Sequence, residues 1–288
     1  MIKFKNIVIV STIIFLVTSC GGNKNNEEVD TSDSTKTSEP IKDTVTGSLN
    51  PQTKQKFNFA ISNIPSPAFS IYELSAYQSK YDVTFLNDLK KIKNYTTEFQ
   101  RASNLGIYNV DMFYAIVNDK GEDVLKYLKN VLTLGDELGL KSAVDAMIGK
   151  RAENNISNQD SLFRILDEVF IKSDTYLRNN DRVFNASIIF TGGWVESLYL
   201  ICKNGQNAQD NATAVKVYNH LWEQQLYIDK LIGLLNDFKA KPECTDLITD
   251  LNAISASLKE IKEPRDMDDA KFNAISAKVY ALRDKLTK

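Results

Sequence analysis

Histidine is almost missing from this chain, since His220 is the only one in 288 residues. A carboxylate-bridged di-iron bundle needs two Glu-x-x-His motifs, so this class of metal site is excluded. The chain also lacks the Cys-x-x-Cys-His motif of haem attachment and a glycine-rich phosphate loop ahead of a helix. His220 precedes Glu223 by three residues, but we expect this lone pair to be structural or exposed. No metal ion and no cofactor are expected.

An excess of positive charge is missing as well. The chain has 35 Lys and Arg residues against 37 Asp and Glu residues, and without Lys3 and Lys5 near the N-terminus the balance is 33 against 37. No basic run is present that would follow a phosphate backbone. Nucleic acid is therefore disfavoured as a partner.

Signals for β-strands are also lacking. No window of four or more residues alternates clearly between apolar and polar side chains, and glycine-centred hairpin turns are missing. Apolar residues recur instead at spacings of three and four, which is the period of an α-helix. No repeat of solenoid type returns at a fixed spacing. The sequence predicts an all-α fold of about ten helices, either a multi-helix bundle or an irregular helical array.

The last two expected helices form a helical hairpin. One apolar stripe follows "LITDLNAISASLKEI" and a second follows "FNAISAKVYALRDKL". Pro264 ends the first helix and Asp268 caps the second. The expected helices upstream cover 66–80, 84–94, 97–118, 121–138, 141–154, 158–179, 182–203 and 211–239. Three of their starts carry cap signals, namely Ser66 before Pro67, Thr97 with Gln100, and Ser157 before an acidic first turn.

The N-terminus has the features of a bacterial lipoprotein signal. Lys3 and Lys5 precede an apolar segment, residues 7–17, that is shorter than the roughly 20 residues needed to span a bilayer. The stretch "LVTSC" at its end resembles the lipobox, in which the cysteine is acylated and becomes the first residue of the mature chain. The resemblance implies that residues 1–19 are a signal peptide and that Cys20 is lipidated. The acyl chains would hold the protein on a membrane essentially permanently.

The residues after Cys20 suggest where the protein is held. Gly21 stands where the lipoprotein signal for retention in the inner membrane has aspartate, so the resemblance favours the outer membrane. The stretch "NKNNEEVD" that follows resembles the surface-export signal of Bacteroidota-type lipoproteins, which leaves the periplasmic and cell-surface faces both open. Because residues 20–60 contain almost no aliphatic side chains, we expect a disordered polar stalk there. Residues 61–288 are long enough for one all-α domain with a substantial core.

Four stretches of this domain resemble an uncharacterised family of all-helical envelope lipoproteins of the same bacterial group. They are "PSPAFSIYELS" (65–75), "LGIYNVDMFYA" (105–115), "NQDSLFRIL" (158–166) and "GGWVESLYL" (192–200). The resemblance implies a helical lipoprotein of the cell envelope and names no activity.

Two acidic residues stand within apolar helical stretches and define a candidate ligand site. Asp111 lies within "IYNVDMFYAIV", and Glu196 follows the Gly192-Gly193-Trp194 run closely. A glycine inside a helix costs about 1 kcal/mol relative to alanine, so two in succession indicate that another backbone or a ligand approaches closely. The candidate site is Tyr108, Asp111, Gly192, Gly193, Trp194, Glu196 and Tyr199. The alternative is that the acids pair with an arginine or cap a helix, and that the glycines let two helices pack.

Two classes of function follow from these features. The first is a membrane-tethered, non-catalytic binding or scaffold module, for which an envelope protein is a candidate partner. The second is an envelope hydrolase that uses a carboxylate pair, with the two carboxyl groups roughly 5 to 9.5 Å apart across an open cleft. No known catalytic motif is visible, so the first class is favoured.

Cys202 and Cys244 are the only cysteines besides Cys20. An oxidising compartment favours a disulfide between them. However, the expected helix over 211–239 runs between them and is roughly 40 Å long at a rise of 1.5 Å per residue, whereas bridged Cα atoms lie about 4.4 to 6.8 Å apart. We therefore predict two free, largely buried cysteines.

Overall fold

The computed structural model describes residues 51–75, 81–140, 147–208 and 210–288. Within these ranges the chain contains only helices and connecting segments, which confirms the all-α prediction. The α-helices are α1 (Pro51–Ser62), α2 (Pro67–Ser75), α3 (Glu98–Val117), α4 (Gly121–Glu137), α5 (Met147–Asn154), α6 (Gln159–Asn179), α7 (Val183–Gln206), α8 (Asn211–Glu223), α9 (Gln225–Leu235), α10 (Pro242–Lys259) and α11 (Asp269–Leu286). The 3₁₀ helices are η1 (Val83–Phe85), η2 (Leu89–Asn94), η3 (Asn236–Phe238) and η4 (Pro264–Asp266).

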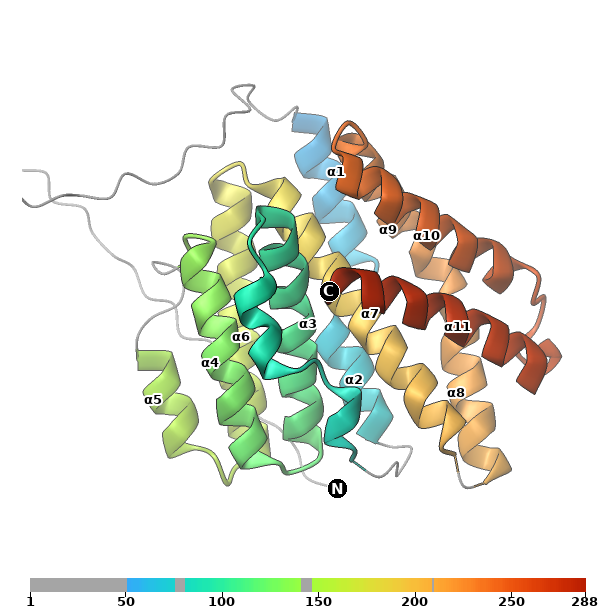
Figure 1. The fold of residues 1–288 in the computed structure, drawn as a ribbon, viewed down its shortest axis with the longest axis horizontal. Coiled ribbons are helices and arrows are strands. Elements are labelled where there is room, and N and C mark those ends of the chain that lie inside the picture. Colours follow the sequence, from blue (N-terminus) through green and yellow to red (C-terminus); the bar gives the residue numbers. More distant parts are fainter. Residues whose placement is uncertain (1–50, 76–80, 141–146, 209) are drawn as a thin grey trace, which may run out of the picture. The chain divides into compact units, whose positions relative to one another are not determined.

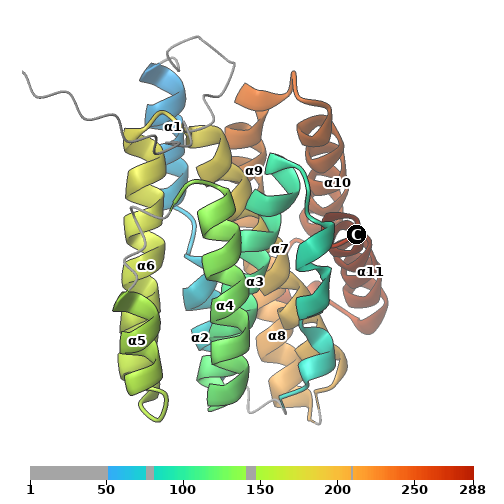
Figure 2. The same cartoon turned by 60° about the vertical axis from the view of Figure 1, so that its left-hand side comes forward.

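Helices α3 and α7 form the centre of the domain. Both are apolar around most of their circumference, and nearly all their side chains between residues 102–116 and 185–202 are buried. A helix that is apolar on all sides has to be covered on all sides. Figures 1 and 2 show α5 and α6 on one side of this central pair and α10 and α11 on the other. Helices α2 and α4 pack against α3, whereas α8 and α11 pack against α7.

Glycines allow α3 and α7 to approach closely. A Cβ atom added at Gly192 would overlap the carbonyl oxygen of Ser103, and one added at Gly106 would lie 2.7 Å from the backbone nitrogen of Gly193. Real Cβ atoms do not come so near to backbone atoms, so these positions require glycine. The prediction that the Gly192-Gly193 run marks a close approach is confirmed, and the approaching group is the backbone of α3.

The C-terminal helical hairpin has the predicted form. The side chain of Asp268 accepts a hydrogen bond from the backbone N–H of Lys271 and so caps α11. The expected stripes of α10 and α11 are buried, and α11 also packs against α7. The capping box of Thr97 and Gln100 at the start of α3 is formed as well. Cys202 and Cys244 are free and buried, as predicted.

The folded domain begins earlier than the sequence suggested. Helix α1 starts at Pro51, inside the stretch expected to be a polar stalk, and Phe57 and Ala60 of α1 belong to the core. The prediction of a stalk is therefore wrong for residues 51–60. The reason is that a few apolar residues at helical spacing suffice to dock a short helix, although the average composition is polar. Residues 20–50 of the expected stalk, and the signal peptide, lie outside the described residues.

Two expected helices are interrupted. In place of one helix over 84–94 the chain forms η1 and η2, because Asp82 and Asp88 each accept a backbone N–H two residues ahead and so cap short turns. The expected helix over 211–239 divides at Gln224 into α8 and α9 and ends in η3. The cap of α6 is Asn158 and not Ser157, since the Asn158 side chain accepts from the backbone N–H of Ser161. Residues 76–80 and 141–146 of two other expected helices lie outside the described ranges.

Candidate functional site

Asp111 of α3 and Glu196 of α7 lie together in the core, and both side chains have an exposed fraction of 0%. Arg283 of α11 faces Glu196 through two hydrogen bonds. Its Nε donates to Oε2 at 3.0 Å and its Nη2 donates to Oε1 at 3.1 Å. A paired guanidinium with this forked geometry is the favourable way to hold a carboxylate away from water. Both acids are therefore buried close to one another, and Glu196 is paired with an arginine.

Asp111 is the member of the pair whose pKa is raised. Its Oδ2 accepts from the backbone N–H of Asn87 at 3.0 Å. Its Oδ1 accepts no hydrogen bond from the described residues. The protonated form of Asp111 can donate a hydrogen bond to Glu196. Burial, followed by the charge of Glu196, raises the pKa of Asp111 well above its usual value. The surroundings of Asp111 therefore favour its neutral form.

Asn87 extends this network within the core. Its side-chain amide donates to the hydroxyl of Tyr95 at 2.9 Å and to Oδ1 of Asn104 at 3.2 Å. The hydroxyl of Tyr127 donates to the carbonyl of Asn87 at 3.0 Å. The amide of Asn104 donates to the carbonyl of Leu286 at 2.8 Å. These bonds tie the segment between η1 and η2, and the end of α11, to α3.

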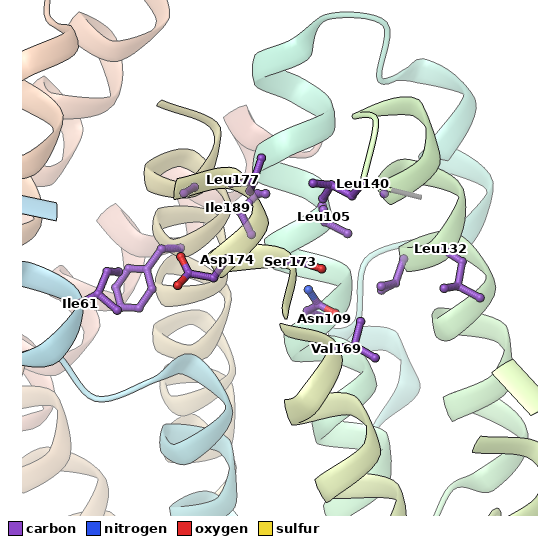
Figure 3. A pocket seen from close by; sticks show the side chains of 14 residues that line it. Ile61, Leu105, Asn109, Leu132, Leu140, Val169, Ser173, Asp174, Leu177 and Ile189 are labelled. Atoms are coloured by element: carbon purple, nitrogen blue, oxygen red, sulfur yellow. The ribbon is translucent and has the colours of Figure 1, made fainter. Parts of the chain in front are cut away.

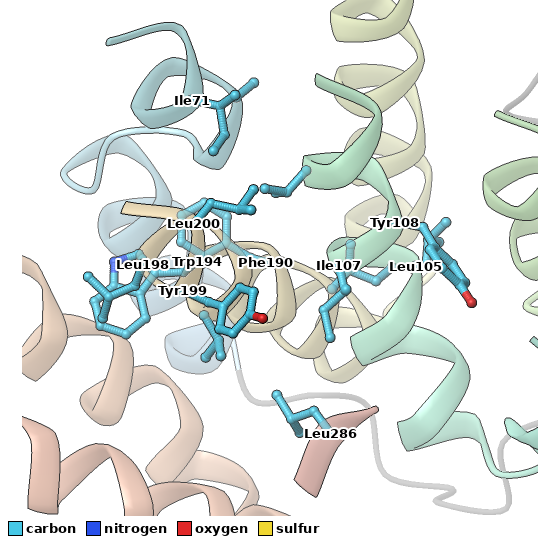
Figure 4. Close-up of a cluster of buried hydrophobic side chains, with 14 of the residues drawn as sticks. Ile71, Leu105, Ile107, Tyr108, Phe190, Trp194, Leu198, Tyr199, Leu200 and Leu286 are labelled. Carbon is cyan, nitrogen blue, oxygen red and sulfur yellow. The ribbon is translucent and has the colours of Figure 1, made fainter. Parts of the chain in front are cut away.

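The three aromatic residues of the candidate site are not brought together. The hydroxyl of Tyr108 donates to the carbonyl of Asp88 at 2.9 Å, whereas Nε1 of Trp194 donates to Oε1 of Gln224 at 3.1 Å. Tyr199 lies under the guanidinium of Arg283, whose Cζ is 4.6 Å from the ring centroid. Figure 4 shows Tyr108 pointing away from the helix that carries Trp194 and Tyr199.

These residues therefore have the structural role that the sequence offered as the alternative to a ligand site. The acids pair with an arginine, and the glycines let two helices pack. A hydrolase built on Asp111 and Glu196 would need substrate and water between the two carboxyl groups. Both groups are instead enclosed and hydrogen-bonded to each other, so the geometry does not favour that function at this pair.

His220 has a structural setting. Its Nδ1 lies 3.5 Å from Oε2 of Glu73, and the side chain has an exposed fraction of 6%. Burial lowers the pKa of His220 to about 4. No cluster of His, Cys, Asp and Glu suited to a metal ion occurs among the described residues.

A cavity lies between α6 and the pair α3 and α4, and extends to Ile61 of α1 (Figure 3). It encloses about 570 Å³ including the space at its mouth. The lining is mostly apolar: Ile61, Leu105, Val131, Leu132, Leu140, Val169, Leu177, Ala186, Ile189 and Phe190, with Gly135. None of the seven residues of the candidate site lines this cavity.

Three polar residues also line the cavity, namely Asn109 of α3 and Ser173 and Asp174 of α6. Oδ2 of Asp174 forms an ion pair with Nη2 of Arg178 at 2.8 Å. Burial raises the pKa of Asp174 above its usual value. An aliphatic cavity with a few polar groups is the usual form of a small-molecule site.

Sequence reasoning missed both Arg283 and this cavity. A signal for Arg283 was present, because it lies four residues after Val279 and beside Leu282 on the apolar stripe of the last helix. A charged residue on such a stripe indicates a buried partner. The cavity has no comparable signal, since its lining comes from helices far apart in the sequence.

The described helices include none that is long and apolar enough to cross a membrane. In comparisons with protein-family models, curated proteins and solved structures, the chain has no match. The resemblance to helical envelope lipoproteins therefore stays a prediction.

Proposed function

We propose that this chain is a lipid-anchored protein of the bacterial cell envelope whose α-helical domain binds a ligand or partner without catalysing a reaction. The observation that carries the anchor is the stretch Leu16 to Cys20 directly behind an apolar segment with two lysines before it. Acylation of Cys20 would place the protein on a membrane, and Gly21 favours the outer membrane. An envelope protein is a candidate partner.

Cys20 and the described domain are separated along the sequence. Residues 21–50 lie between Cys20 and the start of α1, and a chain of this length reaches at most about 100 Å. The non-catalytic role is supported by the acid pair, because Asp111 and Glu196 are enclosed and already paired within the core.

Replacement of Cys20 tests the anchor. Wild-type protein from cells should begin with an acylated Cys20, whereas Cys20→Ser should remain an unacylated precursor, because serine offers no thiol for acylation. Mass spectrometry of the N-terminal peptide measures both. Cys244→Ser is the matched control and should be processed as wild type. A mature wild-type chain with any other first residue would contradict the proposal, and separation of the two membranes on a density gradient tests its location.

A further inference from the structure

Exposed aromatic side chains occur on only two helices of the described chain, α1 and α2. They are Phe59, Phe69 and Tyr72, with exposed fractions of 64%, 51% and 58%. Every other aromatic residue whose burial the structure describes is buried or half-buried. Large exposed apolar groups that gather on one surface mark places where a protein contacts a partner or a membrane. We call the surface formed by these three side chains the aromatic face.

The packing of α1 and α2 turns the aromatic face away from the core. Phe57 and Ala60 fill the core side of α1, and Ile71 fills that of α2. Both helices pack against α7, and Figures 1 and 2 place both on the side of α3 and α7 that lies away from η1 and η2. Phe69 and Tyr72 are three residues apart and therefore share one side of α2. The aromatic face is thus confined to one side of the domain.

The charges beside the aromatic face largely cancel. Helix α1 contains two lysines and no acidic residue. Nζ of Lys54 lies 3.8 Å from Oδ1 of Asp181, and Nζ of Lys56 lies 2.7 Å from Oδ1 of Asp237. The only acidic residue of α2 is Glu73, which is half-buried. Apolar contact, and not an excess of charge, would therefore hold this face on another surface.

The position of α1 in the chain favours a membrane as that surface. If Cys20 is acylated, as proposed above, residues 21–50 alone separate the bilayer from α1. A chain of this length reaches at most about 100 Å. Confinement within that distance corresponds to an effective concentration on the order of 1 mM. Even a weak affinity for lipid would then bring the face onto the bilayer.

We propose that the aromatic face rests in the interface of the phospholipid bilayer that holds the anchor, with Phe59, Phe69 and Tyr72 among the lipid headgroups. Aromatic side chains are favourable at this depth, because an apolar ring leaves water there without entering the hydrocarbon fully. This inference rests on the proposed anchor, and it adds the side of the domain that faces the membrane. The side with η1 and η2 is then open to other partners in the envelope.

A chemical tether tests this orientation without relying on acylation in cells. The test protein is the expected mature chain, residues 20–288, which keeps every described residue. Its Cys20 can be coupled to a maleimide lipid in phosphatidylcholine vesicles. The coupling is selective because Cys202 and Cys244 are buried, and burial raises the pKa of their thiols to about 12 and about 11.

Added tryptophans report contact with the lipid. Phe59→Trp and Phe69→Trp each place an indole in the aromatic face. Val83→Trp on η1 is the matched control, because Val83 is also 51% exposed and lies on the other side of α3 and α7. With brominated acyl chains in the vesicles, the emission added by the two face variants should fall at least about twofold, and that added by the control should not change. The emission of the wild-type chain is subtracted, and circular dichroism should show each variant folded.

Removal of aromatic rings gives a second test. In the Phe59→Trp background, Phe69→Ser with Tyr72→Ser should reduce the quenching, whereas Val83→Ser should leave it unchanged. Because the charges beside the face cancel, added salt should not reduce the quenching either.

Two results would overturn the proposal. One is equal quenching of Val83→Trp and Phe69→Trp. The other is a lack of quenching at Phe59→Trp and Phe69→Trp, which would assign the face to a protein partner that pure lipid vesicles do not contain. Neither result bears on the acylation of Cys20, because mass spectrometry measures it separately.

Discussion

Asp111→Asn tests whether the core holds a neutral carboxylic acid. Asparagine has the shape of aspartic acid, and its amide can donate to Glu196 as the protonated acid does. The raised pKa of Asp111 follows first from burial and second from the charge of Glu196. If this account is right, wild type and variant differ in how their stability depends on pH.

Proton binding by Asp111 decides whether the free energy of unfolding rises or falls with pH. An aspartate in the unfolded chain has a pKa of about 3.9, and folding raises the pKa of Asp111. Above about pH 4 the folded protein therefore holds this proton while the unfolded chain has lost it, and the free energy of unfolding falls by up to about 1.4 kcal/mol per pH unit. The decline ends at the folded pKa. Below about pH 4 both states hold the proton and the contribution vanishes.

Asp111→Asn lacks this proton, so its stability relative to wild type should increase with pH by up to about 1.4 kcal/mol per unit in that window. Urea unfolding of both proteins at a series of pH values measures the difference, and its plateau gives the folded pKa of Asp111. Asp246→Asn on the exposed face of α10 is the control and should give a constant difference.

Glu196→Gln is a second variant that tests the pKa of Asp111. It removes the charge that raises the pKa of Asp111 and leaves Arg283 facing Asp111 alone. The dependence on pH should then weaken, because the guanidinium favours the ionised form of Asp111. A difference between Asp111→Asn and wild type that does not change between about pH 4 and pH 7 would refute the protonated acid.

Three other predictions follow from burial and packing. Gly192→Ala should lower the free energy of unfolding by at least about 1 to 3 kcal/mol, because its methyl group would overlap the backbone of α3; Gly233→Ala, on an open helix face, should raise it slightly in the same urea titration. Cys202 and Cys244 should both react with a thiol reagent after unfolding without reductant, and neither should react in the native protein, where burial raises their pKa values to about 12 and about 11. Because burial lowers the pKa of His220 to about 4, its contribution to stability should rise between about pH 4 and pH 6.5, and His220→Gln should lose that rise.

The repeat of apolar residues at three and four made most of the helices predictable. The stripes of α10 and α11, the turn at Pro264 and the caps at Thr97 and Asp268 depend on residues close together in the chain. The same local chemistry indicated the close approach at Gly192 and the burial of Asp111 and Glu196. It did not identify the residues that contact Gly192, Asp111 and Glu196 in the folded domain.

The errors occur where distant contacts override local preference. Helix α1 folds because Phe57 finds the core, although its neighbours are polar. The long helix expected over 211–239 divides at Gln224, whose side chain accepts a hydrogen bond from Trp194 of α7. Neither partner lies within the stretch whose composition or period was considered.

The sequence by itself determined the all-α class, most helix boundaries and the kinds of residue that had to be buried, because each depends on spacing along one helix. Tertiary structure decided that Arg283 pairs with Glu196 and that burial raises the pKa of Asp111. It also placed aliphatic residues of five helices around one cavity that has polar groups but no unpaired charge among its described residues. These outcomes depend on distances between residues far apart in the chain, and only the packing of the helices sets those distances.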